Sequence, residues 1–430
     1  MAQDKPRIIL RTAGLANPRA LKTYIEHAEG YTAIKKVLGG AMTREQLIEE
    51  VKASGLRGRG GAGFPTGLKW TFVPQSDTGP KYLICNNDES EPGTFKDREI
   101  CTVNPHQVIE GMVLAAFAIK ANKGYIYTRW EFQAEIGYLV EAIKEAYAAG
   151  FLGKNILGSG FDFDLDHYTG AGAYICGEET GLISSLEGKK GQPKVKPPFP
   201  AVSGYLGRPT IVNNTETLAN VPWIVNHGAK EFRQYGTEKS PGSKLFSISG
   251  ALVRPGVYEV PLGYPFERLI QEECGGYLPG RSLQALIPGG ASAPLLTPEE
   301  VQGLTLDYEA MAARNTMLGS GAIMIIDDRQ VLAELLKVTI EFFAHESCGQ
   351  CTPCREGTGW LNNIMDGVLD GTAKPGNVEL MRTVAKHMGG KTICALSDAC
   401  AMPVTSYVQK FSGSLQAYLA QAAAAGGHVK

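Results

Sequence analysis

Residues 82–86 read Tyr-Leu-Ile-Cys-Asn, a compact apolar run of the kind that forms a buried strand. The strongly apolar segment Pro105–Ala121 predicts a helix, and residues 124–128 (Gly-Tyr-Ile-Tyr-Thr) predict a second strand. Glu131–Ala149 has the pattern of an amphipathic helix, and the alternation from Phe161 to His167 indicates a strand with one wet face. Strands that alternate with helices in this way indicate an α/β layer with a largely parallel sheet.

The pattern changes near residue 240. The next segment predicts a hairpin, a short helix and two further strands: Lys244–Gly250 with Val257–Val260, then Pro265–Glu273, Leu283–Ile287 and Gly321–Ile326. This order suggests a small α+β module, of the β-grasp type. From Gln330 onward, apolar residues recur at spacings of three and four, which predicts a bundle of about four helices.

We therefore expect three domains, at residues 1–240, 241–328 and 329–430. The 430 residues are more than one hydrophobic core usually fills. A net charge of −2 lacks the basic field that nucleic-acid binding needs, so no nucleic-acid partner is expected. The longest apolar runs are well short of the ~20 residues that span a bilayer, and the first residues lack the apolar core of a signal peptide. These features predict a soluble, cytosolic protein with no direct membrane span.

Glycine and cysteine are the unusual residue types. The 52 glycines gather in three clusters, at residues 55–67, 170–181 and 275–290, rather than in a linker. The cysteines number nine. An odd count in a chain without a secretory signal argues against a disulfide framework and for metal or redox chemistry.

Cys348-Gly-Gln-Cys351-Thr-Pro-Cys354 is the sharpest chemical signal in the chain. Two interleaved C-x2-C steps let one loop present three thiolates to one compact group, and the spacing suits three corners of a [4Fe–4S] cluster. The fourth thiolate must be remote, with Cys394 and Cys400 as candidates, and His345 can also substitute. A structural zinc site and three unliganded cysteines are the alternatives, although zinc sites usually separate paired ligands by a longer loop.

Residues 58–63 (Gly-Arg-Gly-Gly-Ala-Gly) formally match the dinucleotide fingerprint G-x-G-x-x-G. The context does not fit a Rossmann fold, because the loop follows a helix and Phe64-Pro65 stands where the phosphate-binding helix should begin. So many glycines still allow a ligand to approach the backbone closely, and Arg57, Arg59 and Lys69 supply cationic donors. The alternative is a structural turn that binds nothing.

A second glycine loop, Gly170–Gly177, precedes a predicted helix over Thr180–Leu186. Backbone amides at a helix start attract anions. Glu178 and Glu179 at this start either interact with the helix dipole or hydrogen-bond to ribose or amide groups of a ligand. The run Asn213-Asn214-Thr-Glu-Thr217 is likewise either a capped helix start or a set of polar ligand contacts.

A nucleotide pocket and an iron–sulfur cluster in one chain pose a chemical problem. Hydride donors deliver two electrons at once, whereas iron–sulfur clusters accept one. A flavin can do both, so the two features together favour a flavin between them. A purely structural iron–sulfur scaffold would keep the cysteines but would have no use for the glycine loops.

Several long motifs resemble the NADH-binding flavoprotein subunit of respiratory complex I, the 51-kDa or F subunit. They are Gly55–Trp70, Cys85–Gly93, Gly170–Thr180, Lys196–Pro200 and Glu346–Gly357, in order and spread over most of the chain. The diaphorase subunits of NAD-linked hydrogenases and formate dehydrogenases are related and form the alternative. Many of those carry extra ferredoxin-like or thioredoxin-like domains, for which this chain has no room, so the complex I branch is favoured.

The resemblance implies an atypical FMN- and NADH-binding α/β domain, then a ubiquitin-like module, then a helical bundle with a [4Fe–4S] cluster. Carried over by motif, the residues expected around FMN are Gly58, Arg59, Gly60, Gly61, Ala62, Gly63, Gly67, Lys69, Asn86, Asp88, Glu89, Gly177, Glu178, Asn213, Asn214 and Thr217. The adenine of NADH is expected on Phe64, Phe72 and Phe199, and the remainder on Glu91, Tyr174, Glu179 and Lys196. The cluster is expected on Cys348, Cys351, Cys354 and Cys394, with Cys400 an extra cysteine.

The resemblance also implies an activity. NADH passes a hydride to FMN, and single electrons then reach the cluster, partner subunits and finally quinone. Positioning supplies the catalysis, so no acid–base residue is nominated. The expected partners are a small thioredoxin-like [2Fe–2S] subunit and the large iron–sulfur subunit of complex I. The expected location is cytoplasmic, peripheral on the inner face of the cell membrane.

Overall fold

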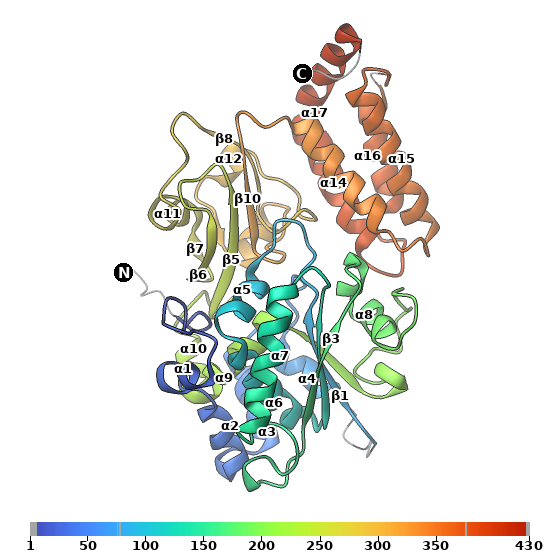
Figure 1. The fold of residues 1–430 in the computed structure, drawn as a ribbon. Coiled ribbons are helices and arrows are strands. Elements are labelled where there is room, and N and C mark those ends of the chain that lie inside the picture. Colours follow the sequence, from blue (N-terminus) through green and yellow to red (C-terminus); the bar gives the residue numbers. More distant parts are fainter. Residues whose placement is uncertain (1–6, 75, 77–78, 375, 427–430) are drawn as a thin grey trace.

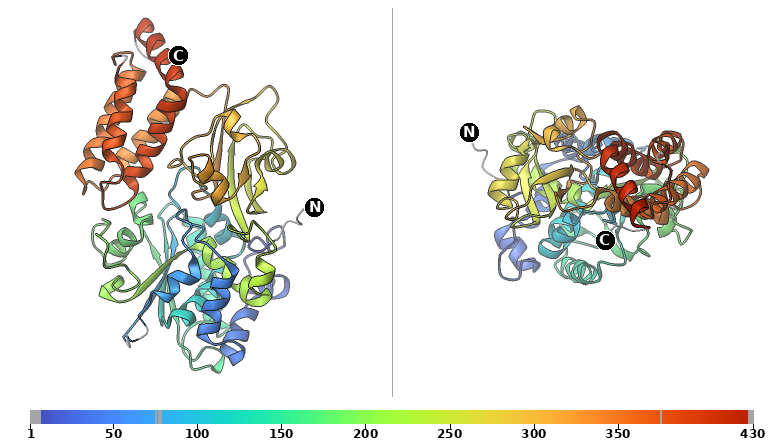
Figure 2. Two further views of the ribbon diagram at one scale, coloured as in Figure 1. Left: turned by 180° about the vertical axis from the view of Figure 1, so that it is seen from behind. Right: turned by 90° about the horizontal axis from the view of Figure 1, so that it is seen from above.

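The computed structural model describes residues 7–426 except 75, 77–78 and 375. Residues 1–6, whose sequence lacks the apolar core of a signal peptide, lie outside this range. The chain forms an α/β layer, a middle region with a sheet of its own, and a helical bundle. Figures 1 and 2 show the middle region and the bundle standing next to each other on the same side of the α/β layer.

The first sheet is parallel and has the strand order β3-β2-β1-β4. Its strands are β1 (Tyr82–Asn87), β2 (Lys123–Thr128), β3 (Asp164–Thr169) and β4 (Thr210–Asn214). The predicted strands at 82–86 and 124–128 are confirmed, and the predicted wet strand begins at Asp164. β4 has no counterpart among the strands predicted from the sequence, and its Ile211-Val212 pair is its main β-forming signal.

Alternating side chains of the sheet enter two different cores. Leu83 of β1 and Ile211 of β4 belong to the core that also contains α6 (Pro105–Ile119), α7 (Gln133–Ala148) and α9 (Thr215–His227). Ile84 and Val212, on the opposite face, pack in the core of α8 (Glu179–Leu186) and the helical bundle. Both faces of β1 are covered, which explains why residues 82–85 are apolar without a break.

Shorter helices surround this layer. They are α1 (Leu21–His27), α2 (Thr32–Lys36), α3 (Arg44–Ser54), α4 (Thr66–Thr71), α5 (Lys96–Val103) and α10 (Ala229–Phe232). The start of α3 is a capping box: Thr43 Oγ1 accepts from the amide of Gln46, and the Gln46 side chain accepts from the amide of Thr43. These reciprocal bonds satisfy amides that lack a partner within the helix.

The middle region contains a mixed sheet with the order β6-β5-β10-β8. Its strands are β5 (Ser243–Gly250), β6 (Gly256–Pro261), β8 (Leu283–Ile287) and β10 (Ala322–Asp327), with β7 (Tyr264–Pro265) and β9 (Thr305–Leu306) pairing beside it. β5 and β6 form the predicted hairpin, and the central pair β5–β10 is parallel. The helical segment 266–273 lies where the sequence predicts a short helix. Short helices α12 (Pro298–Val301) and α13 (Tyr308–Ala313) precede β10.

The last part of the chain is the predicted helical bundle. It comprises α14 (Leu332–Glu346), α15 (Thr352–Leu369), α16 (Gly376–Met388) and α17 (Leu396–Ala425). Leu336, Leu361, Met381 and Val404 each come from a different helix and share one core. Among the described residues, none of the helices combines the length and the apolar character that crossing a membrane requires.

Candidate functional site

The site lies at the carboxyl ends of β1 and β4. From β1 the chain moves outward through β2 to β3 and then returns to β4 on the other side of β1. Such a switch point leaves a crevice in which α/β proteins bind ligands. Asn86 of β1 pairs in register with Asn214 of β4, and Cys85 pairs with Asn213. Three amide side chains therefore gather where a ligand is expected.

Two adjoining cavities open at this point. Cavity A measures about 830 Å³, within the range of small-molecule sites. The predicted residues that line it are Gly58, Gly60, Ala62, Gly63, Phe64, Lys69, Phe72, Asn86, Gly177, Glu179, Lys196, Phe199, Asn213, Asn214 and Thr217. Cavity B measures about 400 Å³ and shares Gly60, Ala62, Asn86, Gly177 and Asn214 with cavity A. Gly61, Asp88, Glu89, Glu91, Tyr174 and Glu178 also line cavity B.

The first glycine loop, between α3 and α4, forms a wall of both cavities. A Cβ atom on Gly60 would lie 3.0 Å from Cβ of Asn214, so the loop passes β4 at a distance that suits glycine. Tyr308 donates a hydrogen bond to the carbonyl of Gly58 at 3.0 Å, which ties the loop to the middle region. Within the described chain, the amides of Gly60, Gly61 and Ala62 have no hydrogen-bond partner. Free amides in a glycine loop form a cradle for phosphate.

Two predicted residues line neither cavity. The Arg59 side chain is fully buried and donates from Nη2 to the carbonyl of Pro241 at 2.9 Å, so its guanidinium turns away from the loop surface. Its backbone amide still supports the site, because it donates to Oγ1 of Thr217 at 2.8 Å. Gly67 lies within α4, where a Cβ atom would come within 2.6 Å of Lys52. Close packing of α3 and α4 accounts for this glycine.

Charged side chains from three segments meet on one side of cavity A. Glu179, the first residue of α8, pairs with Lys69 at 2.9 Å and with Lys196 at 2.8 Å. Lys196 also pairs with Glu178 at 2.9 Å. Burial by itself would raise the pKa of Glu179, but the two lysines more than offset it, so the pKa lies below its ordinary value. Glu179 is therefore charged and flanked by two ammonium groups.

Three phenylalanines from two segments line cavity A and are unusually exposed. Phe64, Phe72 and Phe199 are 44%, 49% and 57% exposed. The rings of Phe64 and Phe72 lie 6.0 Å apart and are tilted by 54°. Exposed rings at a cavity mouth are suited to stack on a flat heterocycle. The three residues that the sequence assigns to the adenine thus line one cavity, and the binding of the adenine to them stays a prediction.

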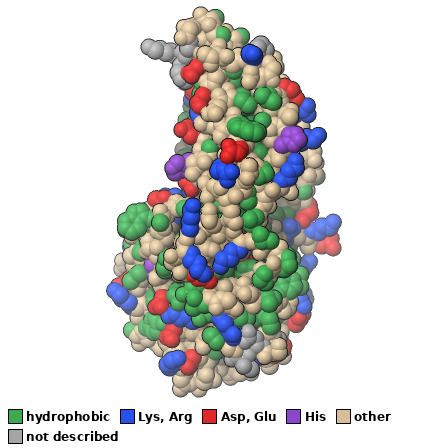
Figure 3. Space-filling model, turned by 90° about the vertical axis from the view of Figure 1, so that its right-hand side faces the viewer, with side chains coloured by type: hydrophobic (Ala, Val, Ile, Leu, Met, Phe, Trp, Pro, Cys, Tyr) green, Lys and Arg blue, Asp and Glu red, His purple; other side chains and the backbone are tan. Residues whose placement is uncertain are grey.

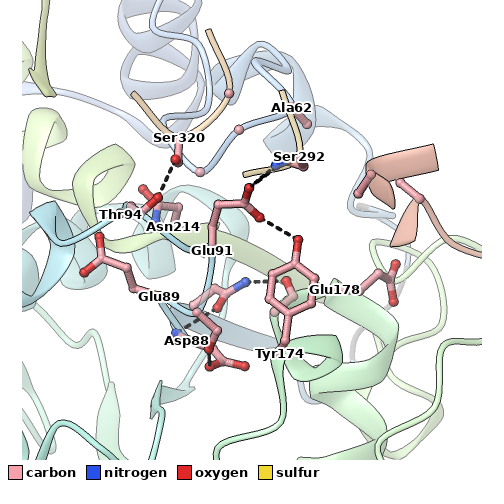
Figure 4. A pocket seen from close by; sticks show the side chains of 18 of the residues that line it. Ala62, Asp88, Glu89, Glu91, Thr94, Tyr174, Glu178, Asn214, Ser292 and Ser320 are labelled. Carbon is pink, nitrogen blue, oxygen red and sulfur yellow. Dashed lines mark hydrogen bonds between the residues drawn. The ribbon is translucent and has the colours of Figure 1, made fainter. Parts of the chain in front are cut away.

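Cavity B is lined by carboxylates (Figure 4). Burial raises the pKa of Asp88 to about 7, although Ser90 donates to it and opposes the rise. Oδ2 of Asp88 is buried and has no hydrogen-bond partner in the described chain. Glu89 accepts the amides of Lys96, Asp97 and Arg98, so it caps the start of α5 as well as facing the cavity.

The middle region supplies a wall of cavity B that sequence reasoning missed. Gly289, Ser292, Met317, Gly319 and Ser320 line it. Ser320 Oγ lies 2.6 Å from Oγ1 of Thr94, across the boundary between the two regions (Figure 4). The third glycine cluster, which ends at Gly290, is the signal in the sequence that marked this segment.

Cys348 and Cys351 lie between α14 and α15, Cys354 lies in the first turn of α15, and Cys394 lies just before α17. The amide of Ile393 donates to Sγ of Cys351 at 3.4 Å, which brings the two segments into contact. Burial raises the pKa of the Cys394 thiol to about 11, and the nearby thiols of Cys348 and Cys354 add to the rise. Cys400 is fully buried within α17, and among these cysteines only Cys354 contributes to its raised pKa. The surroundings of Cys394 therefore match the predicted fourth ligand better.

Within the described chain, no three His, Cys, Asp or Glu side chains are arranged around one point as ligands of a single metal ion. A [4Fe–4S] cluster takes one thiolate at each of four separate corners. The donor set of four thiols from two adjoining segments fits such a cluster, and His345, 83% exposed, pairs with Glu346 instead. Cys85, Cys101, Cys176 and Cys274 are buried, as expected for packing residues.

The cluster segment lies between cavity B and the protein surface. Cys394 lines cavity B, whereas Cys351 lines another cavity together with Lys196 and Lys391. Figure 3 shows Lys and Arg side chains around the junction of the bundle and the α/β layer. Cavity A, the carboxylate-lined cavity B and the thiol of Cys394 thus follow one another along the site.

Comparisons with known proteins identify the family. Residues 51–223 match the Nuo51 FMN-binding domain, and residues 334–418 match the NADH-ubiquinone oxidoreductase-F iron-sulfur binding region. An NADH-quinone oxidoreductase F subunit of Rhizobium meliloti, the one designated F 2, is 47% identical over 96% of this chain and 97% of its own length. The chain belongs to the F-subunit family. The NADH-quinone oxidoreductase F subunit of Streptomyces coelicolor is 49% identical over 91% of this chain and 86% of its own length.

Solved structures agree with this placement. One of them is the crystal structure of an NAD+-reducing [NiFe]-hydrogenase in the H2-reduced state. A chain of that structure is 37% identical in sequence to this F-subunit family member, and the two superpose with a TM-score of 0.81 over 91% of the present chain. This protein spans 64% of that hydrogenase chain. Family membership brings FMN and a [4Fe–4S] cluster as cofactors and NADH as substrate.

Proposed function

We propose that this F-subunit family member oxidises NADH and passes the electrons singly to its [4Fe–4S] cluster and on to partner subunits towards quinone. FMN, when bound, accepts a hydride and releases the electrons one at a time. The observation that carries the proposal is the continuity of the site. Cavities A and B share their wall at the switch point, and cavity B extends to Cys394.

The residues of the glycine loop are assigned to the flavin. The free amides of Gly60–Ala62 and the ammonium group of Lys69 suit the phosphate of FMN, since both are donors to an anion. Asn86 and Asn214 border both cavities and supply polar contacts to the rest of the group. Asp88, Glu89 and Glu178 line the side of the site towards the cluster.

The remaining predicted contacts are assigned to NADH. Phe64, Phe72 and Phe199 are suited to hold the adenine by stacking. Glu179 and Lys196 lie beside them in cavity A, whereas Glu91 and Tyr174 lie in cavity B. A dinucleotide extends far enough to contact both groups. The chain contributes orientation rather than proton transfer, so no residue is assigned as a general acid or base.

We assign the domain division 1–240, 241–328 and 329–430, with a ubiquitin-like middle domain. The order β6-β5-β10-β8, with a parallel central pair and antiparallel outer pairs, supports a β-grasp module. The apolar cores of the α/β layer and of the middle region are largely separate, with Leu245 of β5 joining the first, and this supports the first boundary.

The proposed partners are a thioredoxin-like [2Fe–2S] subunit and a large iron–sulfur subunit, in a complex on the inner face of the cell membrane. The names of the relatives support membership in such a complex. Cys351, at a surface cavity, supports electron exit to a neighbouring protein. Expression of this chain alone should give poor solubility or cluster loss, and co-expression with the thioredoxin-like partner should rescue both. Equal stability and full flavin content without the partner would count against the assignment.

Absorbance spectroscopy of the co-expressed, purified complex tests the function. We expect flavin and cluster bands together, and bleaching of both when NADH is added anaerobically. Ferricyanide should then restore the oxidised spectrum. A protein with the cluster bands but no flavin would refute the function and return the chain to the class of structural iron–sulfur scaffolds.

The alternative function is that of a diaphorase subunit in an NAD-linked hydrogenase or formate dehydrogenase. The hydrogenase structure is a relative by sequence and fold, and its chain is longer than this one. Identification of the co-purifying subunits separates the two functions. Quinone-reductase subunits support the proposal, and a [NiFe] or formate-oxidising subunit contradicts it.

A further inference from the structure

Glu91 in cavity B is held by two separate parts of the chain. Its Oε1 accepts two hydrogen bonds from Ser292, one from the amide and one from Oγ, both at 2.7 Å. Its Oε2 accepts from the hydroxyl of Tyr174 at 2.6 Å. Figure 4 shows the carboxylate between the tyrosine and the serine. Ser292 belongs to the middle region, whereas Glu91 and Tyr174 belong to the α/β layer.

This arrangement differs from that of Glu179. Glu179 is balanced by two lysines, but Glu91 forms no ion pair with any described residue. Its negative charge is therefore stabilised by neutral donors, and two of the three come from Ser292. Burial raises the pKa of Glu91, and the hydrogen bonds from Tyr174 and Ser292 oppose the rise.

The backbone around Ser292 is shaped to fit Glu91. Gly290 has φ of +97°, and a Cβ atom there would come within 2.6 Å of Cγ of Glu91. Both facts require glycine at this position. The amide of Ala291 donates to the carbonyl of Pro92 at 3.2 Å, so the two segments also join through their backbones. The segment Gly289–Ser292 thus packs closely against Glu91 and holds its carboxylate in place.

Ser320 connects the segment Gly289–Ser292 to the segment that carries Glu91. Ser320, which follows α13, donates its amide to the carbonyl of Gly289 at 3.2 Å. Its hydroxyl lies 2.6 Å from that of Thr94, three residues beyond Glu91. The segment that carries Glu91 is therefore anchored to the middle region at both ends.

We propose that Ser292 is a positioning residue, which fixes Glu91, and through it Tyr174, in the geometry that binds the nicotinamide dinucleotide. This inference rests on the proposed function. It gives the middle region a part in substrate binding, whereas the sequence motifs for NADH lie outside that region. Ser292 borders cavity B, but it is 8% exposed and both its amide and its hydroxyl donate to Glu91, so it acts by orientation and not by contact with the reacting atoms.

The test uses the purified, flavin- and cluster-loaded complex and measures the dissociation constant of NAD+ by calorimetry from pH 5 to 9. Titratable and charged groups that line cavity B with Glu91 are Tyr174, Asp88, Glu89, Glu178, Lys96, Asp97 and Cys394. Ser292→Ala removes one donor to the charged form of Glu91, so the break in affinity caused by its protonation should move up by about one pH unit. Ser292→Thr keeps the hydroxyl and should restore the wild-type break.

Two further variants keep the test decisive. Ser282→Ala, an exposed serine of the same region, is the matched control and should leave the profile unchanged. In a Glu91→Gln background the break should vanish, and Ser292→Ala should then add no further change, because the two residues act through one interaction.

An unmoved break in Ser292→Ala, or one that Ser292→Thr does not restore, overturns the positioning role. An additive effect of Ser292→Ala in the Glu91→Gln background also overturns it. Failure of the wild-type complex to bleach with NADH would instead refute the proposed function itself, so the two failures are distinguishable.

Discussion

We predict that Glu179 is the residue whose charge bears most directly on the choice of nucleotide. It is ionised and lies between the ammonium groups of Lys69 and Lys196. Glu179→Gln removes the negative charge and releases both lysines, which can then pair with the 2′-phosphate of NADPH. We expect wild type to prefer NADH strongly and the variant to lower the NADH:NADPH ratio of kcat/KM by about tenfold or more. Ferricyanide assays with both nucleotides measure this ratio.

A matched control directly follows the same helix. Glu187, the residue after α8, also pairs with two lysines, Lys189 at 2.7 Å and Lys194 at 3.4 Å, but does not line cavity A or cavity B. Glu187→Gln should leave the ratio unchanged. Comparable wild-type activity with NADPH would refute the preference, and an unchanged ratio in Glu179→Gln would refute the role of this residue.

Cys394 and Cys400 offer a second contrast at the scale of one side chain. Cys394 is half-buried, lines cavity B and lies near the thiols of the cluster loop. Cys400 is buried inside α17. Cys394→Ser should therefore abolish or alter the EPR signal of the reduced cluster, and Cys400→Ser should leave it intact. The reverse pattern would assign the fourth ligand to Cys400.

The residues of the site differ in how far the sequence could predict them. Glycines, carboxylates and cysteines in tight motifs are recognisable because their spacing is local. Ser292 bonds to Glu91 across 201 residues of sequence, so no local pattern connects them. Arg59 lies inside a recognised motif, yet its side chain faces the interior. Motif position does not fix the direction of a side chain.

At the scale of elements, α2 depends on a carboxylate from another helix. Oε1 of Glu110, in α6, accepts the amides of Ala33 and Ile34 at 3.0 and 3.3 Å. Oε2 accepts from the amide of Tyr31 at 2.8 Å and the hydroxyl of Tyr24 at 2.6 Å. The amides at the start of a helix lack partners of their own, so Glu110 supplies the cap that α2 itself does not contain.

Glu110→Gln should destabilise the fold by about 2 kcal/mol at pH 5. The amide nitrogen of Gln would face N–H or O–H donors, and it cannot accept a hydrogen bond from them. Burial raises the pKa of Glu110 to about 7. Between its ordinary pKa of 4.5 and 7, the unfolded chain has released a proton that the folded chain retains, so the wild type loses stability as pH rises. The advantage of wild type over Glu110→Gln should shrink from pH 5 to pH 8. Urea unfolding at both pH values measures this change, and a constant difference would contradict it.

The sequence predicts helices and strands correctly where the apolar segment is long or continuous, and it does not predict the short strand β4. Helices such as α6 and the strands β1 and β2 carry continuous apolar runs, and their positions are confirmed. The strand β4 has five residues and merges at once into α9. Its pairing with β1, which creates the switch point, is a tertiary event with no local signature.

At the scale of the whole molecule, a buried charge cluster joins the middle region to the α/β layer. Lys244 of β5 pairs with Glu216 of α9 at 3.0 Å, and Lys96 of α5 pairs with the same carboxylate at 2.8 Å. The side chains of all three are at most 1% exposed. Lys244 also donates to the carbonyl of Arg59 in the glycine loop at 3.3 Å. Charges buried so deeply stabilise a structure only while each keeps its partners.

Lys244→Met tests this connection, because methionine matches the length of the lysine side chain without its charge. The variant leaves Glu216 with one fewer cation and the Arg59 carbonyl without this donor, so we expect a loss of about 3 kcal/mol in the free energy of unfolding. Flavin affinity should also fall, since the glycine loop loses an anchor, whereas Lys239→Met, at an exposed position in the same segment, should change neither. Urea unfolding and flavin fluorescence measure the two effects. A Lys244→Met protein with wild-type stability and wild-type flavin affinity would show that the two regions are held together by their apolar contacts and not by this cluster.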